Sequence, residues 1–139
     1  MSPGAPGPDR YLASAGLPPR QSSRVGRLWR AASALPGVTC GSYGLGHARF
    51  IVGRKTFAYI LNNHHHDGLL CLCVKSTMTR QLELTRADPD AYRVPAYLGH
   101  QGWVSIRLDR AKFDRVAAAG LLAEACALQA PRRKVARGV

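Results

Sequence analysis

The residues with the clearest metal-ligand chemistry are the consecutive His64, His65, His66 and Asp67. Imidazole nitrogens and carboxylate oxygens bind zinc, which requires three or four ligands at fixed geometry. In an extended chain His64 and His66 point the same way, and His100 is a candidate third ligand. Adjacent histidines in a polar turn rarely form such a site unaided. We therefore expect a hairpin turn here and no cofactor, with a metal site as the alternative.

The other side chains with catalytic potential are not grouped. Cys71 and Cys73 share one face of an apolar run over residues 69–75, where free thiols act as small hydrophobic side chains. Asp88 and Asp109 lie at turns and candidate helix starts, and they are not paired as acid–base chemistry requires. The sequence therefore favours a protein without catalytic activity.

Positive charge dominates the composition, with 20 Lys and Arg against 8 Asp and Glu and a net charge of +12. The excess lies over residues 24–75 and 130–139, while residues 76–101 are balanced. This distribution favours contact with a polyanion, and no base-reading motif is visible, so we expect little sequence specificity. A solvated surface is the alternative interpretation. The candidate phosphate-binding residues are Arg24, Arg27, Arg30, Arg54, Lys55, Arg107, Arg132, Arg133 and Lys134.

Two aromatic residues, Tyr97 and Trp103, could stack on bases if they lie on an open face of a sheet. Trp103 alternates with Ser105 and Arg107 on one face of a predicted strand, opposite Val104 and Ile106. Large aromatic side chains are mostly packing units, so we favour burial of Trp103 over base stacking.

Three segments divide the chain. Residues 1–23 hold five of the nine prolines, and such a composition predicts a disordered tail. Residues 24–131 have the patterns of one folded domain, and residues 132–139 form a basic tail. Ser23 is a candidate N-cap for a helix that ends at Pro36-Gly37.

Alternating apolar residues predict an antiparallel meander. The expected strands cover residues 38–43, 49–52, 55–61, 69–75 and 104–108, with a tight turn at Gly53-Arg54. In the third of these strands Phe57, Tyr59 and Leu61 are expected on one face. The fourth is apolar until its last residue and should be central.

Two further helices are predicted. The first covers residues 77–85, with Met78 and Leu82 facing inward. The second is expected to begin after an Asp109 cap and to run over residues 110–129. Its expected buried residues are Phe113, Val116, Ala117, Gly120, Leu121 and Leu128. Glu124 falls close to this face, so either Gly120 interrupts the helix or Glu124 has a polar partner.

The compartment follows from what the sequence lacks. There is no C-x-x-C pair, no apolar signal segment at the N-terminus and no transmembrane-length run. We therefore expect a cytoplasmic protein with reduced thiols and no membrane association.

The pattern Pro95-x-Tyr97-x-Gly99-x-x-Gly102-Trp103 resembles the MmcQ/YjbR family. The resemblance extends from Val25 to about Lys134. It implies a CyaY-like α+β fold, an antiparallel sheet of four to five strands flanked by N- and C-terminal helices. That fold has been likened to a double-wing DNA-binding module, and DNA binding is the usual label of the family. The chain departs from the family pattern at Cys126, where an aromatic is expected, and at Phe113, where Trp is common.

We thus expect a small cytoplasmic protein that binds nucleic acid through phosphate contacts. Two alternatives stay open. The first is a ligand- or metal-binding protein, or an enzyme, with a pocket formed by His64, His66, His100, Tyr97 and Trp103. The second is a protein-interaction module whose basic face meets an acidic partner.

Overall fold

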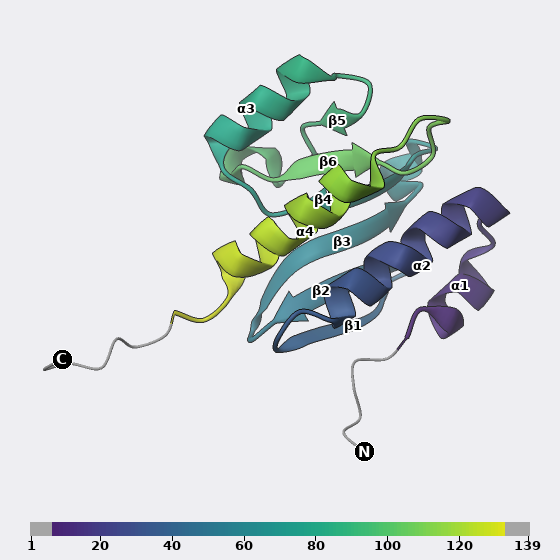
Figure 1. Ribbon diagram of the computed structural model, residues 1–139. Helices are drawn as coiled ribbons and strands as arrows, with labels where there is room; N and C mark the ends of the chain where they lie inside the picture. Colours follow the sequence, from purple (N-terminus) through teal and green to yellow (C-terminus); the bar gives the residue numbers. More distant parts are fainter. Residues whose placement is uncertain (1–6, 133–139) are drawn as a thin grey trace, which may run out of the picture.

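The computed structural model describes residues 7–132, and Figure 1 shows the arrangement of their helices and strands. In chain order the elements are α1 (Asp9–Ala15), α2 (Pro19–Ser33), β1 (Val38–Tyr43), β2 (His47–Val52), β3 (Lys55–Asn62), η1 (His64–His66), β4 (Leu70–Val74), α3 (Met78–Ala87), β5 (Tyr92–Arg93), η2 (Gly99–Gln101), β6 (Val104–Arg107) and α4 (Arg115–Gln129). Within the described residues, no helix is both long enough and apolar enough to cross a membrane.

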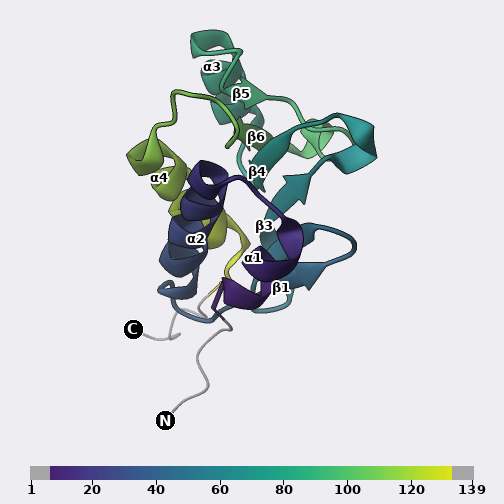
Figure 2. The same ribbon diagram turned by 90° about the vertical axis from the view of Figure 1, so that its right-hand side faces the viewer.

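The strands form one antiparallel sheet in the order β1-β2-β3-β4-β6-β5. In the turned view of Figure 2, α2 and α4 lie on one side of this sheet, while α3 lies beside β5 in Figure 1. The predicted α+β architecture is confirmed, and β4 is central and buried as expected. The sixth strand is β5, whose two residues are too few for an alternating pattern to be visible in the sequence.

The core between the sheet and the helices is built around Trp29 of α2. Its ring stacks on Tyr11 with centroids 5.5 Å apart and meets Phe50 edge-on at 5.4 Å. Phe57 continues the series 6.2 Å from Phe50. Aromatic pairs at such distances add to the free energy gained from burying the rings.

A β-bulge changes the predicted faces of β3. Phe50 pairs with Ala58, but Ile51 pairs with Thr56, so Phe57 is an extra residue on its strand. Phe57 therefore lies in the helix-side core with Ala58. The expectation that Phe57 shares a face with Tyr59 is wrong for this reason.

The structure also differs from the expectation of a disordered tail over residues 1–23. Residues 9–15 form α1, and α2 begins at Pro19, without a capping bond from Ser23. Tyr11 is only 2% exposed, and its hydroxyl donates to the carbonyl of Gly46 at 2.8 Å. The number of prolines alone does not predict disorder here. Pro19 suits the first turn of a helix, and Trp29 provides an apolar surface on which Tyr11 packs. Residues 1–6 lie outside the described part of the chain.

Helix α3 confirms the predicted helix but not its inward face. The Thr77 hydroxyl accepts from the Arg80 amide at 3.1 Å, so the helix starts where expected. Met78 and Leu82 are about half exposed, and the buried residue is Gln81. Gln81 Nε2 donates to the carbonyls of Gly99 at 2.8 Å and Trp103 at 2.6 Å. A polar residue can face inward because these two acceptors satisfy its amide.

Helix α4 starts five residues later than predicted. Asp114 caps it by accepting from the Ala117 amide at 3.0 Å. Asp109 instead accepts from the side chain of Arg107 and from the Leu70 amide. With this later start, α4 turns a different face to the core than predicted. Val116 and Leu128 are exposed, and the buried residues are Ala118, Leu121, Leu122, Ala125 and Cys126.

Of the two alternatives for Glu124, a helix break at Gly120 or a polar partner, the structure shows the polar partner. Glu124 lies on the exposed side of α4, 3.6 Å from Arg80 of α3. The helix continues through Gly120 without a break. An exposed pair of this kind contributes about 0–1 kcal/mol, so the conflict over Glu124 came from the misplaced helix start.

A substitution tests whether α1 is part of the folded domain. We expect Tyr11→Ala to lower the free energy of unfolding by about 3 kcal/mol, because it removes a buried ring from Trp29. Tyr11→Phe should cost about 1 kcal/mol for the lost hydrogen bond, and the exposed control Arg10→Ala less than about 0.5 kcal/mol. Urea unfolding measures all three. A stability of Tyr11→Ala equal to that of the control would show that α1 does not dock.

Candidate nucleic-acid interface and a cavity on the opposite sheet face

The cations predicted on α2 have different surroundings. Arg24 is half-buried and donates to the carbonyls of Leu108 and Ala111 at 2.9 and 3.1 Å, and also to that of Arg110. Its guanidinium lies 4.9 Å from the ring centroid of Phe113, and desolvation together with nearby Arg20 lowers its pKa. Arg24 therefore joins the segment before α4 to α2, and three of its five N–H donors are already engaged.

Arg27 and Arg30 are exposed but lie on different sides of α2. Arg27 lines a groove of about 250 Å³ between α2 and α4. Across the groove, α4 contributes Arg115 and Val116. Arg30 lies on the α1 side, because a Cβ built at Gly26 would be 3.3 Å from its Nη1 atom.

The β2–β3 turn brings a second group of cations together. Gly53 has a φ of +60° and packs so closely on Pro131 that a Cβ would lie 2.8 Å from Pro131 Cγ. Exposed Arg54 and Lys55 follow in the turn, and exposed Arg132 follows Pro131. Three predicted cations are thus gathered at the C-terminal end of α4. Arg133 and Lys134 lie outside the described residues.

Arg107 is paired within the protein. Its Nε donates to Asp109 Oδ1 at 2.9 Å, and this bond raises the pKa of Arg107. The carboxylate neutralises its charge, so Arg107 is a poor candidate for phosphate contact.

Sequence reasoning missed Lys112 and Arg115, which are both exposed. They escaped notice because the predicted helix start placed them in the second predicted helix, beside Val116 on its supposed buried face. With α4 in its observed register, Arg115 meets Arg27 across the groove. Both cations were visible in the sequence, but their position on the surface depended on the register of α4.

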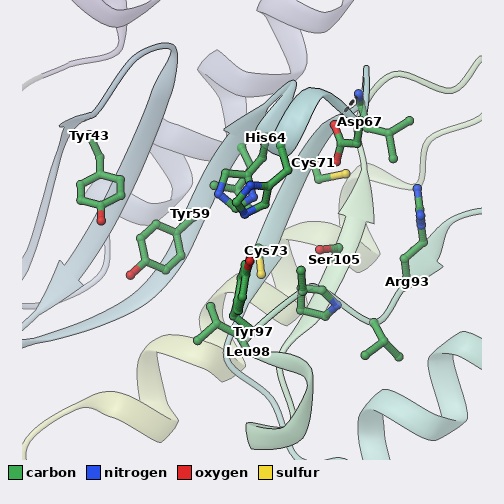
Figure 3. A pocket seen from close by; sticks show the side chains of 16 residues that line it. Tyr43, Tyr59, His64, Asp67, Cys71, Cys73, Arg93, Tyr97, Leu98 and Ser105 are labelled. Atoms are coloured by element: carbon green, nitrogen blue, oxygen red, sulfur yellow. Dashed lines mark hydrogen bonds between the residues drawn. The ribbon is translucent and has the colours of Figure 1, made fainter.

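The face of the sheet opposite the helices contains a cavity of about 490 Å³. Its floor comes from alternating residues of β3, β4 and β6, whose neighbours point into the helix-side core. Figure 3 shows Tyr43 and Tyr59 at one end and Asp67 and Arg93 at the other. The lining residues are Tyr43, Tyr59, Leu61, His64, His65, Asp67, Leu69, Cys71, Cys73, Arg93, Val94, Pro95, Ala96, Tyr97, Leu98 and Ser105.

The two candidate stacking residues have opposite environments. Trp103 is 4% exposed, with its ring centroid 5.7 Å from that of Tyr59. It packs on this face of the sheet, as we favoured from the sequence, and its ring is not accessible to bases. Tyr97 is 75% exposed and lies at the cavity, 5.4 Å from the ring of His65.

The histidine turn does not support a metal site. His65 and His66 have φ values of 54° and 60°, so the chain is not extended and His64 and His66 do not point the same way. His64 lines the cavity, whereas His66, His100 and Trp103 do not. In residues 7–132, no three His, Cys, Asp or Glu side chains are placed to hold a metal ion.

Desolvation and neighbouring histidines lower the pKa of His64, and similar causes lower that of His47. The His47 Nδ1 atom accepts from the Asn62 amide at 3.1 Å, which orients the imidazole. His64 lies beside it, with ring centroids 5.4 Å apart. Both shifts favour the neutral form of the imidazole.

The fold and these sites define a small α+β protein with an antiparallel sheet, helices on one face and a cavity on the other. The YjbR family model matches residues 33–125, about two thirds of the chain, and the chain belongs to the YjbR family. The resemblance noted in the sequence is thereby confirmed.

A solved structure shares the fold. The crystal structure of Deinococcus radiodurans protein DR2400, with a domain termed DUF419, has a TM-score of 0.63 and 23% sequence identity. The similarity covers 75% of this chain and 76% of that one. A comparison with curated proteins found no match.

The four cysteines allow a test of burial. All are buried and free, and desolvation raises the pKa of Cys71 and of Cys73 to about 12. At pH 8 such thiols are almost entirely protonated and unreactive. We expect the native protein to react with iodoacetamide, a small neutral reagent, at least about 100-fold more slowly than the protein unfolded in guanidinium, where four thiols should react. Rapid reaction of the native protein would contradict this burial.

Proposed function

We propose that this YjbR-family protein is a non-catalytic protein that binds the phosphate backbone of nucleic acid. The supporting observation is the placement of exposed cations in two groups, one beside the N-terminal end of α4 and one at its C-terminal end. One is the α2–α4 groove with Arg27 and Arg115, and the other is the group formed by Arg54, Lys55 and Arg132. We call these five residues the basic surface.

The charges of the basic surface are uncompensated. None of its five side chains forms an ion pair with a carboxylate of the described residues, whereas Arg80, Arg107 and Arg110 each do. Arginine and lysine without a protein partner gain most from a phosphate, because bound counterions are released from the nucleic acid. Arg107 is therefore left out of the proposed interface, and Arg24 is left out because its guanidinium already donates to three backbone carbonyls.

Sequence-independent binding follows from the same placement. Phosphate contacts position a protein on nucleic acid, and base contacts read the sequence. Trp103 is buried, and Tyr97 lies on the opposite face of the sheet from the α2–α4 groove. Neither of the two candidate stacking residues thus accompanies the five cations, and we expect little discrimination between sequences.

Salt dependence gives a quantitative test. Five phosphate contacts predict a slope of about −4.5 in a plot of log K against log salt, or about a 500-fold loss of affinity between about 50 and 200 mM salt. The measurement is fluorescence anisotropy with a labelled duplex. Two duplexes of different sequence should bind alike.

Paired substitutions locate the interface. Arg27→Gln with Arg115→Gln, and separately Arg54→Gln with Lys55→Gln, should each reduce the salt slope by about 2. The matched control is Arg86→Gln with Arg93→Gln, which removes the same charge from exposed residues outside the basic surface. An unchanged slope in both test variants, or an equal loss in the control, would contradict the proposed interface.

A further inference from the structure

The cavity on the helix-free face of the sheet has the size and lining of a small-molecule site. Its volume of about 490 Å³ falls within the range of about 300–1,000 Å³ found for such sites. The lining is mostly apolar and aromatic, with a few polar groups, which is also typical. From this lining we propose that the cavity binds a planar aromatic small molecule that carries an anionic group.

The aromatic part of the ligand is inferred from the rings around the cavity. Tyr43 and Tyr59 form one end, with ring centroids 5.6 Å apart. His65 and Tyr97 form a second pair at 5.4 Å. The first pair comes from β1 and β3, and the second comes from η1 and from the loop between β5 and η2. Flat rings pack best against other rings in stacked or edge-on geometry, so a planar ligand fits this lining.

Backbone conformation supports a role for the second pair. His65 and Tyr97 have φ values of 54° and 65°, in the left-handed region that residues with a Cβ avoid. Both residues are bulky, and both direct a ring to the cavity. Unfavourable conformations of this kind are concentrated at binding sites, where they hold a side chain in place.

The anionic group is inferred from the charges at the other end. Arg93 is exposed at the cavity and forms no ion pair with a carboxylate of the described residues. A guanidinium in this setting suits a carboxylate, sulfonate or phosphate. Asp67 is the one carboxylate in the lining, and its Oδ1 already accepts from the Leu69 amide at 2.9 Å. Its second oxygen suits a hydroxyl or N–H group of the ligand.

The site is independent of the proposed nucleic-acid binding. The cavity and the α2–α4 groove lie on opposite faces of the sheet, and none of the five residues of the basic surface lines the cavity. The two proposals can therefore fail separately.

The test compares two fluorescent probes on the full chain. The first, 8-anilinonaphthalene-1-sulfonate, is aromatic and anionic, and the second, N-phenyl-1-naphthylamine, has the same rings without the sulfonate. We expect the anionic probe to bind saturably at one site per chain and to raise the midpoint of thermal unfolding, since binding to the native state stabilises it. Absence of saturable binding would overturn the proposal.

Variants separate the two parts of the proposed recognition. Arg93→Gln should weaken the anionic probe at least about 10-fold and change binding of the neutral probe less than about 2-fold. Tyr97→Asn removes a ring while keeping a residue that tolerates positive φ, and it should weaken both probes. Both positions are exposed, so the variants should fold, as circular dichroism would verify.

The control is Arg115→Gln in the α2–α4 groove, which also combines apolar and cationic residues. It should leave both probes unaffected. Loss of binding in Arg115→Gln with normal binding in Arg93→Gln and Tyr97→Asn would place the probe in the groove and overturn the proposal.

Discussion

One buried amide group joins α3 to the turn that precedes β6. Gln81 is 6% exposed, and its Nε2 atom joins α3 to the carbonyls of Gly99 and Trp103. Gly102 lies between these acceptors, so close to the Thr77 backbone that a Cβ would be 2.8 Å from its carbonyl carbon. A carbonyl left without this donor would cost about 1–3 kcal/mol. The segment that walls the cavity is therefore anchored at its end by α3.

The two faces of the sheet differ in how they are covered, and this difference produces two kinds of surface. Helices α2 and α4 bury one face with apolar side chains and leave their cations at the outer surface. The other face is covered by the segment over residues 93–101, which has little regular structure. Residues 93–98 of this segment line the cavity. The same strands thus support a charged exterior on one side and an aromatic hollow on the other.

Local patterns predicted much of the fold, and they failed where distant residues decide the structure. The Gly53-Arg54 turn, the apolar β4 and the alternation of Trp103 with Val104 were predictable from neighbours alone. The inward position of Gln81 was not, because its acceptors are 18 and 22 residues away. The docking of Tyr11 likewise depends on Gly46, 35 residues away.

The candidate sites show the same division. Four of the five cations of the basic surface were predicted from the sequence, but Arg115 was missed, because its place in the groove with Arg27 depends on the observed position of α4. The cavity was foreseen only through His64 and Tyr97. Tyr43 and Arg93 are 50 residues apart in the sequence. The left-handed backbone of Tyr97 could not be predicted either, because tyrosine normally avoids this conformation. The alternative metal ligands, His64, His66 and His100, would have needed an extended chain where the chain turns.

The two tryptophans lie on opposite sides of the sheet, Trp29 with Tyr11 and Phe50, and Trp103 with Tyr59. Each indole is therefore an intrinsic optical label for one layer of the molecule. A form that retains only Trp29 would report the loosening of α1 and α2. A form that retains only Trp103 would report the opening of the segment above the cavity. Comparing these two forms would therefore show whether the two layers unfold together or separately.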